Sequence, residues 1–210
     1  MLGLMQDHPL LISSIFEHAV GNYGKQEIVS NTVEGGIHRY NYSSWGERTK
    51  KLANALKSLN LNQGDKVGTL AWNGYRHLEI YYATSCSGLI CHTLNPRLHP
   101  DQVSYIVNHA EDKVLCVDLN ILPLIEKASE NFKTVEALVI MTDEKNMIKP
   151  NIKDGIKIIC YEEFIKDQSE EYIWPQLDEK TASSLCYTSG TTGNPKGVLY
   201  SHRSTVLHAY

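Results

Sequence analysis

The chain has 210 residues, of which 42% are hydrophobic and 21% charged, with a formal net charge of −4. This composition is typical of a globular domain, and the acidic balance argues against nucleic acid as a partner. No apolar run is long enough to be a transmembrane segment, and residues 1–12 lack the basic start and long apolar centre of a secretory signal. We therefore expect a cytoplasmic protein of one large domain or two small ones.

Residues 1–62 are predicted to form a small helix/hairpin/helix module at the N-terminus. Residues 10–20 have the spacing of an amphipathic helix that ends at Gly21. Strands over 27–31 and 38–42 would flank a Glu-Gly-Gly turn. Ser44 and Glu47 predict a capping box at the start of a second helix. Its apolar stripe has spacings of four and three and comprises Trp45, Thr49, Leu52, Leu56 and Leu59.

From residue 63 to 210 the pattern alternates between strands and helices. Strands are predicted over 66–72, 88–94, 113–118, 135–141, 157–161 and 183–188. Helices are predicted over 77–87, 101–110 and 121–131, with a last helix capped by Ser201. Short apolar strands separated by helices favour an α/β fold whose mainly parallel sheet carries helices on both faces. In such sheets ligands bind beyond the carboxyl ends of the strands.

The strongest functional signal follows the last predicted strand, over residues 188–197, with the sequence Thr-Ser-Gly-Thr-Thr-Gly-Asn-Pro-Lys-Gly. Its glycines let backbone N–H groups approach a ligand, its hydroxyls add donors, and its lysine adds a positive charge. These features suit a polyanion such as a triphosphate. The loop is not a Walker A motif, because Pro195 stands where the second glycine belongs and Gly197 follows Lys196. The alternative is an ordinary Ser/Gly surface loop.

Residues 185–198 resemble the signature loop of the AMP-forming adenylate-forming enzymes, which include acyl-CoA synthetases, luciferases and peptide-synthetase adenylation domains. Four further stretches, 76–79, 92–98, 107–115 and 199–203, resemble the fatty-acyl-CoA synthetase branch in the same order. The resemblance therefore covers nearly the whole chain. It implies that residues 63–210 are an α/β subdomain of the AMP-binding domain that ends in the signature loop and its following helix.

The resemblance implies a two-step ligase reaction with ATP, Mg²⁺ and coenzyme A. ATP and a fatty acid or other carboxylate would give an acyl-adenylate and pyrophosphate, and coenzyme A would then displace AMP. Lys196 is the implied catalytic residue, because its charge would neutralise the departing pyrophosphate. Thr191 would lie beside the Mg²⁺ ion. The implied phosphate-binding residues are Thr188, Ser189, Gly190, Thr191, Thr192, Gly193 and Lys196.

Members of this family are more than twice as long as the chain, so we expect the chain to be an N-terminal part that is inactive alone. The adenine, ribose and coenzyme A residues would then lie beyond Tyr210. One alternative is a truncated, non-catalytic folding or dimerisation module, since the resemblance implies a homodimer through the N-terminal domain. Another is a ligase for short-chain or aryl acids.

The remaining polar residues and cysteines are predicted to be structural. His77, His92 and His202 are expected to pack or to make structural hydrogen bonds. The pairs 162–163 and 170–171, both Glu-Glu, are expected to be solvated. Arg76 and Arg97 are candidates for structural ion pairs. The cysteines are expected to be mostly buried, reduced thiols: Cys86, Cys91, Cys116, Cys160 and Cys186.

Overall fold

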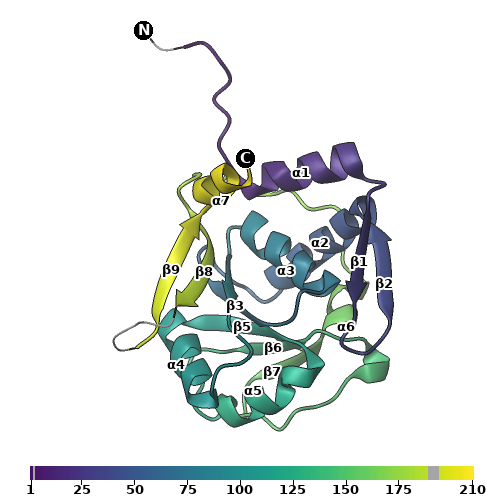
Figure 1. Cartoon of the computed structure of the whole chain (residues 1–210), viewed down its shortest axis with the longest axis vertical. Coiled ribbons are helices and arrows are strands. Elements are labelled where there is room, and N and C mark those ends of the chain that lie inside the picture. The colour runs from purple at the N-terminus through teal and green to yellow at the C-terminus, as the bar shows by residue number, and fades with distance from the viewer. Residues whose placement is uncertain (2, 189–193) are drawn as a thin grey trace.

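The computed structural model describes residues 1, 3–188 and 194–210 (Figure 1). Its strands are β1 (Glu27–Asn31), β2 (Ile37–Asn41), β3 (Lys66–Leu70), β4 (Ile90–Thr93), β5 (Asp112–Val117), β6 (Ala137–Ile140), β7 (Lys157–Cys160), β8 (Ala182–Thr188) and β9 (Lys196–Ser201). Its α-helices are α1 (Ile12–Tyr23), α2 (Tyr42–Lys57), α3 (Tyr75–Cys86), α4 (Pro100–Ala110), α5 (Leu122–Ser129), α6 (Tyr161–Lys166) and α7 (His202–Ala209). Two 3-10 turns, η1 (Leu119–Ile121) and η2 (Glu144–Asn146), complete the described elements.

Seven strands form one sheet in the order β7-β6-β5-β3-β4-β8-β9, and β1 and β2 form a separate antiparallel hairpin. Neighbours in the large sheet are parallel except for the β8–β9 pair at one edge, which is antiparallel. The predicted α/β class with a mainly parallel sheet is therefore confirmed. Because the parallel strands run in one direction, their carboxyl ends lie along one edge, and this is the edge at which open α/β sheets generally bind ligands.

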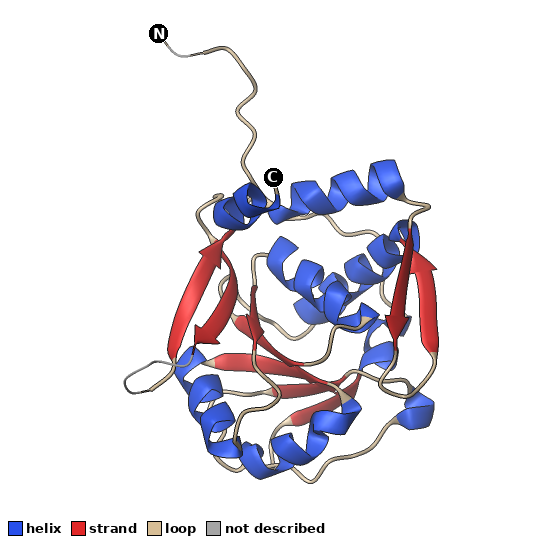
Figure 2. Ribbon diagram, viewed as in Figure 1, coloured by secondary structure: helices blue, strands red, loops and turns tan. Residues whose placement is uncertain are grey.

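Helices cover both faces of this sheet, as Figure 2 shows. On one face α2, α3 and α6 pack over β3, β5, β6 and β7, with Leu56, Ile80 and Tyr161 completely or almost completely buried. On the other face α4 and α5 contribute Val103, Ile106 and Ile125 to a second apolar core. The near-continuous burial of β5 and β6 follows from this double coverage.

The N-terminal and C-terminal helices meet at one end of the molecule (Figure 1). Phe16 of α1, Trp45 of α2 and Val206 of α7 share a third apolar core. The helix α2 thus joins two cores, because its residues Leu52 and Leu56 pack against the sheet. A division of the chain at residue 62 stays a prediction.

Two local predictions are wrong, and one strand was not predicted. The helix α1 continues through Gly21 to Tyr23, since a lone glycine with helical geometry does not stop a packed helix. The helix α2 begins after Asn41, whose side chain accepts a hydrogen bond from the Ser44 N–H at 2.9 Å. Ser44 therefore lies in the first turn and does not form a capping box with Glu47. The strand β9 was not predicted, because its apolar residues do not alternate with polar ones.

Across residues 1, 3–188 and 194–210, no helix has both the length and the apolar character that a membrane crossing requires.

Candidate phosphate-binding site

The signature loop joins β8 to β9 at the carboxyl edge of the sheet. β8 runs parallel to β4, so Thr188 lies at its carboxyl end, and β9 returns antiparallel from Lys196. Thr188 and Lys196 are register partners across the hairpin, and both side chains are exposed. The other predicted phosphate ligands, Ser189 to Gly193, lie outside the described residues. The two predicted ligands that the structure describes therefore lie side by side at the base of the loop, so that a hydroxyl and an ammonium group are near each other.

The predicted Mg²⁺ position, Thr191, also lies outside the described residues. Within the described parts of the chain, no group of three or more His, Cys, Asp or Glu residues could hold a metal ion.

Tyr187 lies in β8, directly before Thr188. Its hydroxyl is 2.5 Å from His109 Nδ1 on α4, and its ring centroid is 5.3 Å from that of His92 on β4. Burial and the nearby Asp112 carboxylate raise the pKa of Tyr187 above its ordinary value. The phenol therefore keeps its proton at neutral pH.

His92 is paired with Asp112 beneath Tyr187. His92 Nδ1 lies 2.8 Å from both carboxylate oxygens, and both residues are fully buried. They meet across β3, where Gly68 leaves room: a Cβ there would lie 2.5 Å from Leu115 Cδ2 and 3.0 Å from Asp112 Oδ2. Burial raises the pKa of Asp112, although the hydrogen bond from His92 acts in the opposite direction. The predicted structural hydrogen bond of His92 is confirmed.

The other two histidines are also structural. His77 Nδ1 donates to the Trp72 carbonyl at 3.1 Å, which leaves Nε2 to accept from Thr69 Oγ1 at 3.0 Å. His202 Nδ1 accepts from the Ile12 N–H at 3.2 Å and so ties α7 to the start of α1. Burial lowers the pKa of both imidazoles, which favours the neutral ring in each case.

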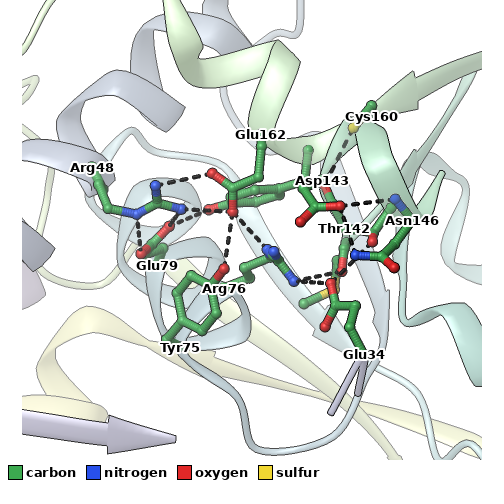
Figure 3. Close-up of polar contacts among 12 residues, drawn as sticks. Glu34, Arg48, Tyr75, Arg76, Glu79, Thr142, Asp143, Asn146, Cys160 and Glu162 are labelled. Atoms are coloured by element: carbon green, nitrogen blue, oxygen red, sulfur yellow. Dashed lines mark hydrogen bonds and ion pairs between the residues drawn. The ribbon is translucent and has the colours of Figure 1, made fainter. Parts of the chain in front are cut away.

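A cluster of buried and half-buried ions, named here the Arg48–Arg76 cluster, lies near the carboxyl edge at the other end of the sheet (Figure 3). Arg48 of α2 bonds to Glu79 of α3 at 2.8 Å and to Glu162 of α6 at 3.0 Å. Arg76 of α3 bonds to Glu162 at 2.7 Å and to Glu34, in the β1–β2 loop, at 2.7 Å. The cluster joins three helices and the hairpin through side chains that are mostly removed from water.

The prediction that Glu162 is solvated is therefore wrong. Glu162 follows the fully buried Tyr161 at the start of α6, and this position turns its carboxylate towards the two arginines. Burial alone would raise its pKa, but hydrogen bonds and charges from Arg48 and Arg76 outweigh burial and hold the pKa below its ordinary value. One sequence signal was available: Arg48 lies three residues after Trp45 and four before Leu52, on the apolar side of α2. A structural ion pair for Arg76 is confirmed.

All five cysteines are free thiols, and Cys86, Cys91 and Cys116 are buried. Burial raises the pKa of Cys116 to about 12 and also raises those of Cys86 and Cys91. These thiols stay protonated at neutral pH and are poor nucleophiles.

The AMP-binding enzyme family model matches residues 16–210 of the chain. The 3-methylmercaptopropionyl-CoA ligase of Ruegeria pomeroyi is 49% identical over 210 residues, which are 100% of this chain and 38% of the relative. The medium-chain-fatty-acid–CoA ligase of Ectopseudomonas oleovorans is 48% identical over 212 residues, with the same two coverages. The long-chain-fatty-acid–CoA ligase of Thermus thermophilus is 42% identical over 98% of this chain and 36% of its own length.

A solved structure agrees with these relatives. The anthranilate CoA ligase AuaEII in complex with anthranoyl-AMP superposes with a TM-score of 0.79 and 25% identity, over 95% of this chain and 37% of that one. The chain thus spans well under half the length of the ligases it matches. With its sheet, its signature loop and these matches in agreement, the chain belongs to the AMP-binding enzyme family.

Proposed function

We propose that this chain forms the N-terminal, phosphate-binding part of an AMP-forming acyl-CoA ligase that activates a fatty acid or a related aliphatic carboxylate. The observation that carries the proposal is the β8–β9 hairpin, which puts Thr188 and Lys196 together at the carboxyl edge of the sheet. It is supported by identities of 42–49%, over almost the whole chain, to ligases for aliphatic acids.

In this proposal the carboxylate oxygen attacks the α-phosphorus of ATP, and the bond to pyrophosphate breaks. The thiol of coenzyme A then attacks the acyl carbon, and AMP leaves. Lys196 stabilises the charge that develops on pyrophosphate, and the Thr188 hydroxyl donates to a phosphate oxygen. Residues 189–193 would complete the phosphate cradle, and Mg²⁺, held near Thr191, would neutralise phosphate charge. Charges placed where negative charge develops lower the barrier to adenylation.

The acyl group is proposed only as aliphatic. The two relatives at 49% and 48% identity carry names for different acids, so identity does not choose between them. A trans-cinnamate ligase of Petunia hybrida is less similar, at 32% identity over 80% of the chain, which makes an aryl substrate the weaker candidate. A cytoplasmic location and a homodimer through the N-terminal part stay predictions.

A second candidate is a non-catalytic folding or dimerisation module. The chain spans about 38% of the length of the ligases it matches, and this coverage does not choose between the two candidates. Such a module would keep the family's fold but would not turn over ATP.

ATP–pyrophosphate exchange separates these candidates. We would measure it, with Mg²⁺, for the chain alone and for a chimera in which the chain replaces the aligned segment of the Ectopseudomonas oleovorans ligase. The acids would be octanoate, palmitate, 3-methylmercaptopropionate, butyrate and benzoate. We expect exchange by the chimera with aliphatic acids and slower exchange with benzoate. A folded chimera without exchange for any acid would contradict the proposal, whereas exchange by the chain alone would exclude the non-catalytic module.

A further inference from the structure

Tyr187 is one of the residues that connect the base of the signature loop to the rest of the fold. It directly precedes Thr188 and is half-buried. Its hydroxyl is 2.5 Å from His109 Nδ1, and the two rings stand edge-to-face with centroids 5.9 Å apart. The contact links the end of β8 to the last turn of α4.

The strand that leaves the loop also contacts the Tyr187 ring. Gly197, which directly follows Lys196, is the register partner of Tyr187 in β9. A Cβ at Gly197 would lie 3.1 Å from Tyr187 Cε2, from Tyr187 Cζ and from Leu185 Cδ1. This is closer than side-chain carbons normally approach, so glycine is what lets the ring lie against β9. One ring therefore touches both strands at the point where the loop begins and ends.

The groups around Tyr187 have partners of their own, although His109 itself is exposed. His109 is stacked on Tyr105 with centroids 5.5 Å apart, and His92 is held by Asp112 in a fully buried pair. In contrast, residues 196–200 of β9 are all exposed, and β9 is an edge strand. An edge strand with little buried surface has few contacts that can fix its position. Two of the three atoms nearest to a Cβ placed at Gly197 belong to the ring of Tyr187.

We propose that Tyr187 is a positioning residue for phosphate binding: bonded to His109 and lying against Gly197, it fixes Thr188 and Lys196 relative to each other and to the sheet. This inference rests on the proposed function of the loop. It adds a specific requirement, namely that the hydroxyl of Tyr187 affects phosphate affinity without contacting phosphate. His109, 78 positions before Tyr187, and Gly197 both act on the Tyr187 ring. Neither residue has to contact the ligand to affect phosphate affinity.

The test uses the ¹⁵N-labelled chain with three changes. Tyr187→Phe removes the hydroxyl and keeps the ring, Gly197→Ala displaces the ring, and His109→Ala removes the partner of the hydroxyl. The control is Tyr23→Phe, since Tyr23 also pairs edge-to-face with a histidine, His18, but on α1 far along the chain. For each protein we would measure the melting temperature, the amide exchange of residues 186–188 and 196–198, and the affinity for Mg–pyrophosphate and MgATP.

We expect Tyr187→Phe to speed amide exchange at the loop base by roughly threefold to tenfold, the scale of one hydrogen bond, and to weaken pyrophosphate binding by a similar factor. Gly197→Ala should act in the same direction, and the Tyr187→Phe/His109→Ala double variant should be no weaker than either single one. All measured properties of the control Tyr23→Phe, including its melting temperature, should stay unchanged.

The opposite results would contradict either the positioning role of Tyr187 or the proposed function of the loop. If the unmodified chain binds pyrophosphate and Tyr187→Phe binds it equally well, the positioning role is wrong and the proposed function stands. The positioning role is also wrong if affinity falls while amide exchange at the loop base does not change. If the unmodified chain binds neither Mg–pyrophosphate nor MgATP, the proposed function of the loop fails, and the positioning role fails with it.

Discussion

The two ends of the large sheet differ in how their polar side chains are satisfied. At the end formed by β5, β6 and β7, helices cover both faces, and the Arg48–Arg76 cluster buries charges that are paired with one another. At the other end, β9 is exposed, and Thr188 and Lys196 face outwards. The first arrangement satisfies polar groups within the protein, whereas the second leaves them available to a ligand. Stability should therefore depend on the first end and phosphate binding on the second.

The largest expected effect on stability is at the closed end. Arg48→Met keeps most of the side-chain volume but leaves the fully buried Glu79 without its cation. Loss of one partner from a buried pair costs about 3–5 kcal/mol of unfolding free energy, because the other charge stays buried and unpaired. Urea unfolding would measure it.

The matched control is Lys51→Met on the same helix. Lys51 pairs with Glu170 at 3.0 Å, but both side chains reach water, and such pairs contribute less than about 1 kcal/mol. Equal losses of unfolding free energy in Arg48→Met and Lys51→Met would contradict the claim that stability depends on the buried charges at this end of the sheet.

The next effect compares two glycines. Gly68→Ala in β3 would push a Cβ against Leu115 and Asp112, which are both fully buried. We expect a loss of about 1–3 kcal/mol, the usual cost of overpacking a core. Gly197→Ala meets contacts at 3.1 Å on an edge strand that is free to shift, so its loss of stability should be smaller. If thermal unfolding showed a larger loss of stability for Gly197→Ala than for Gly68→Ala, β9 would be fixed more firmly than its exposure indicates.

A smaller effect depends on pH. Asp118, at the carboxyl end of β5, accepts from the Trp72 N–H at 2.7 Å. Burial and then the Glu34 carboxylate raise its pKa to about 6, against the effects of the Trp72 N–H and Arg76. The folded protein thus holds this proton at pH values where the unfolded chain has released it. The contribution of Asp118 is therefore complete below about pH 4 and is lost as pH rises through about 6.

Asp118→Asn keeps an acceptor for the Trp72 N–H and removes the titration. We expect the stability of Asp118→Asn relative to the unmodified chain to rise by up to about 2 kcal/mol between pH 4 and pH 7. A difference that stays constant over this range would mean that the carboxyl group ionises normally in the fold.

The smallest expected effect on stability is that of Lys196→Ala. The side chain is exposed at the start of an edge strand, and such substitutions usually change stability by less than about 0.5 kcal/mol. A loss as large as that of Gly68→Ala would show that Lys196 has a structural role and would remove the contrast between the two ends.

The sequence predicts elements best where the signal is local. The predicted strand over 113–118 is found as β5, one residue earlier, because a run of apolar β-formers ends at polar residues. The helix α5 begins where Pro123 fits its first turn. In contrast, α6 has only six residues and a Glu-Glu pair that looks solvated, and β9 exists because it pairs with β8. Short elements whose partners are distant carry little local signal.

The residues discussed for the candidate site also divide into those that share one sequence motif and those that are distant in the sequence. Thr188 and Lys196 belong to one contiguous motif, so their presence in one loop could be expected from the sequence, but their register pairing depends on β9, which was not predicted. The contact of Tyr187 with His109 joins residues 78 positions apart, and that of Arg48 with Glu162 joins residues 114 apart. No periodicity or spacing rule relates such pairs, because their meeting depends on the order of strands in the sheet.

The central claim is that the β8–β9 loop binds the phosphates of ATP and that Lys196 supplies charge there. The most direct measurement is a titration of the ¹⁵N-labelled chain and of Lys196→Ala with MgATP, followed by amide shifts. We expect shifts at Thr188 and Lys196 in the unmodified chain and an affinity lower by roughly tenfold or more in Lys196→Ala, the scale of losing one charged contact to phosphate. Equal affinities for the two proteins, or shifts confined to residues away from this loop, would contradict the claim.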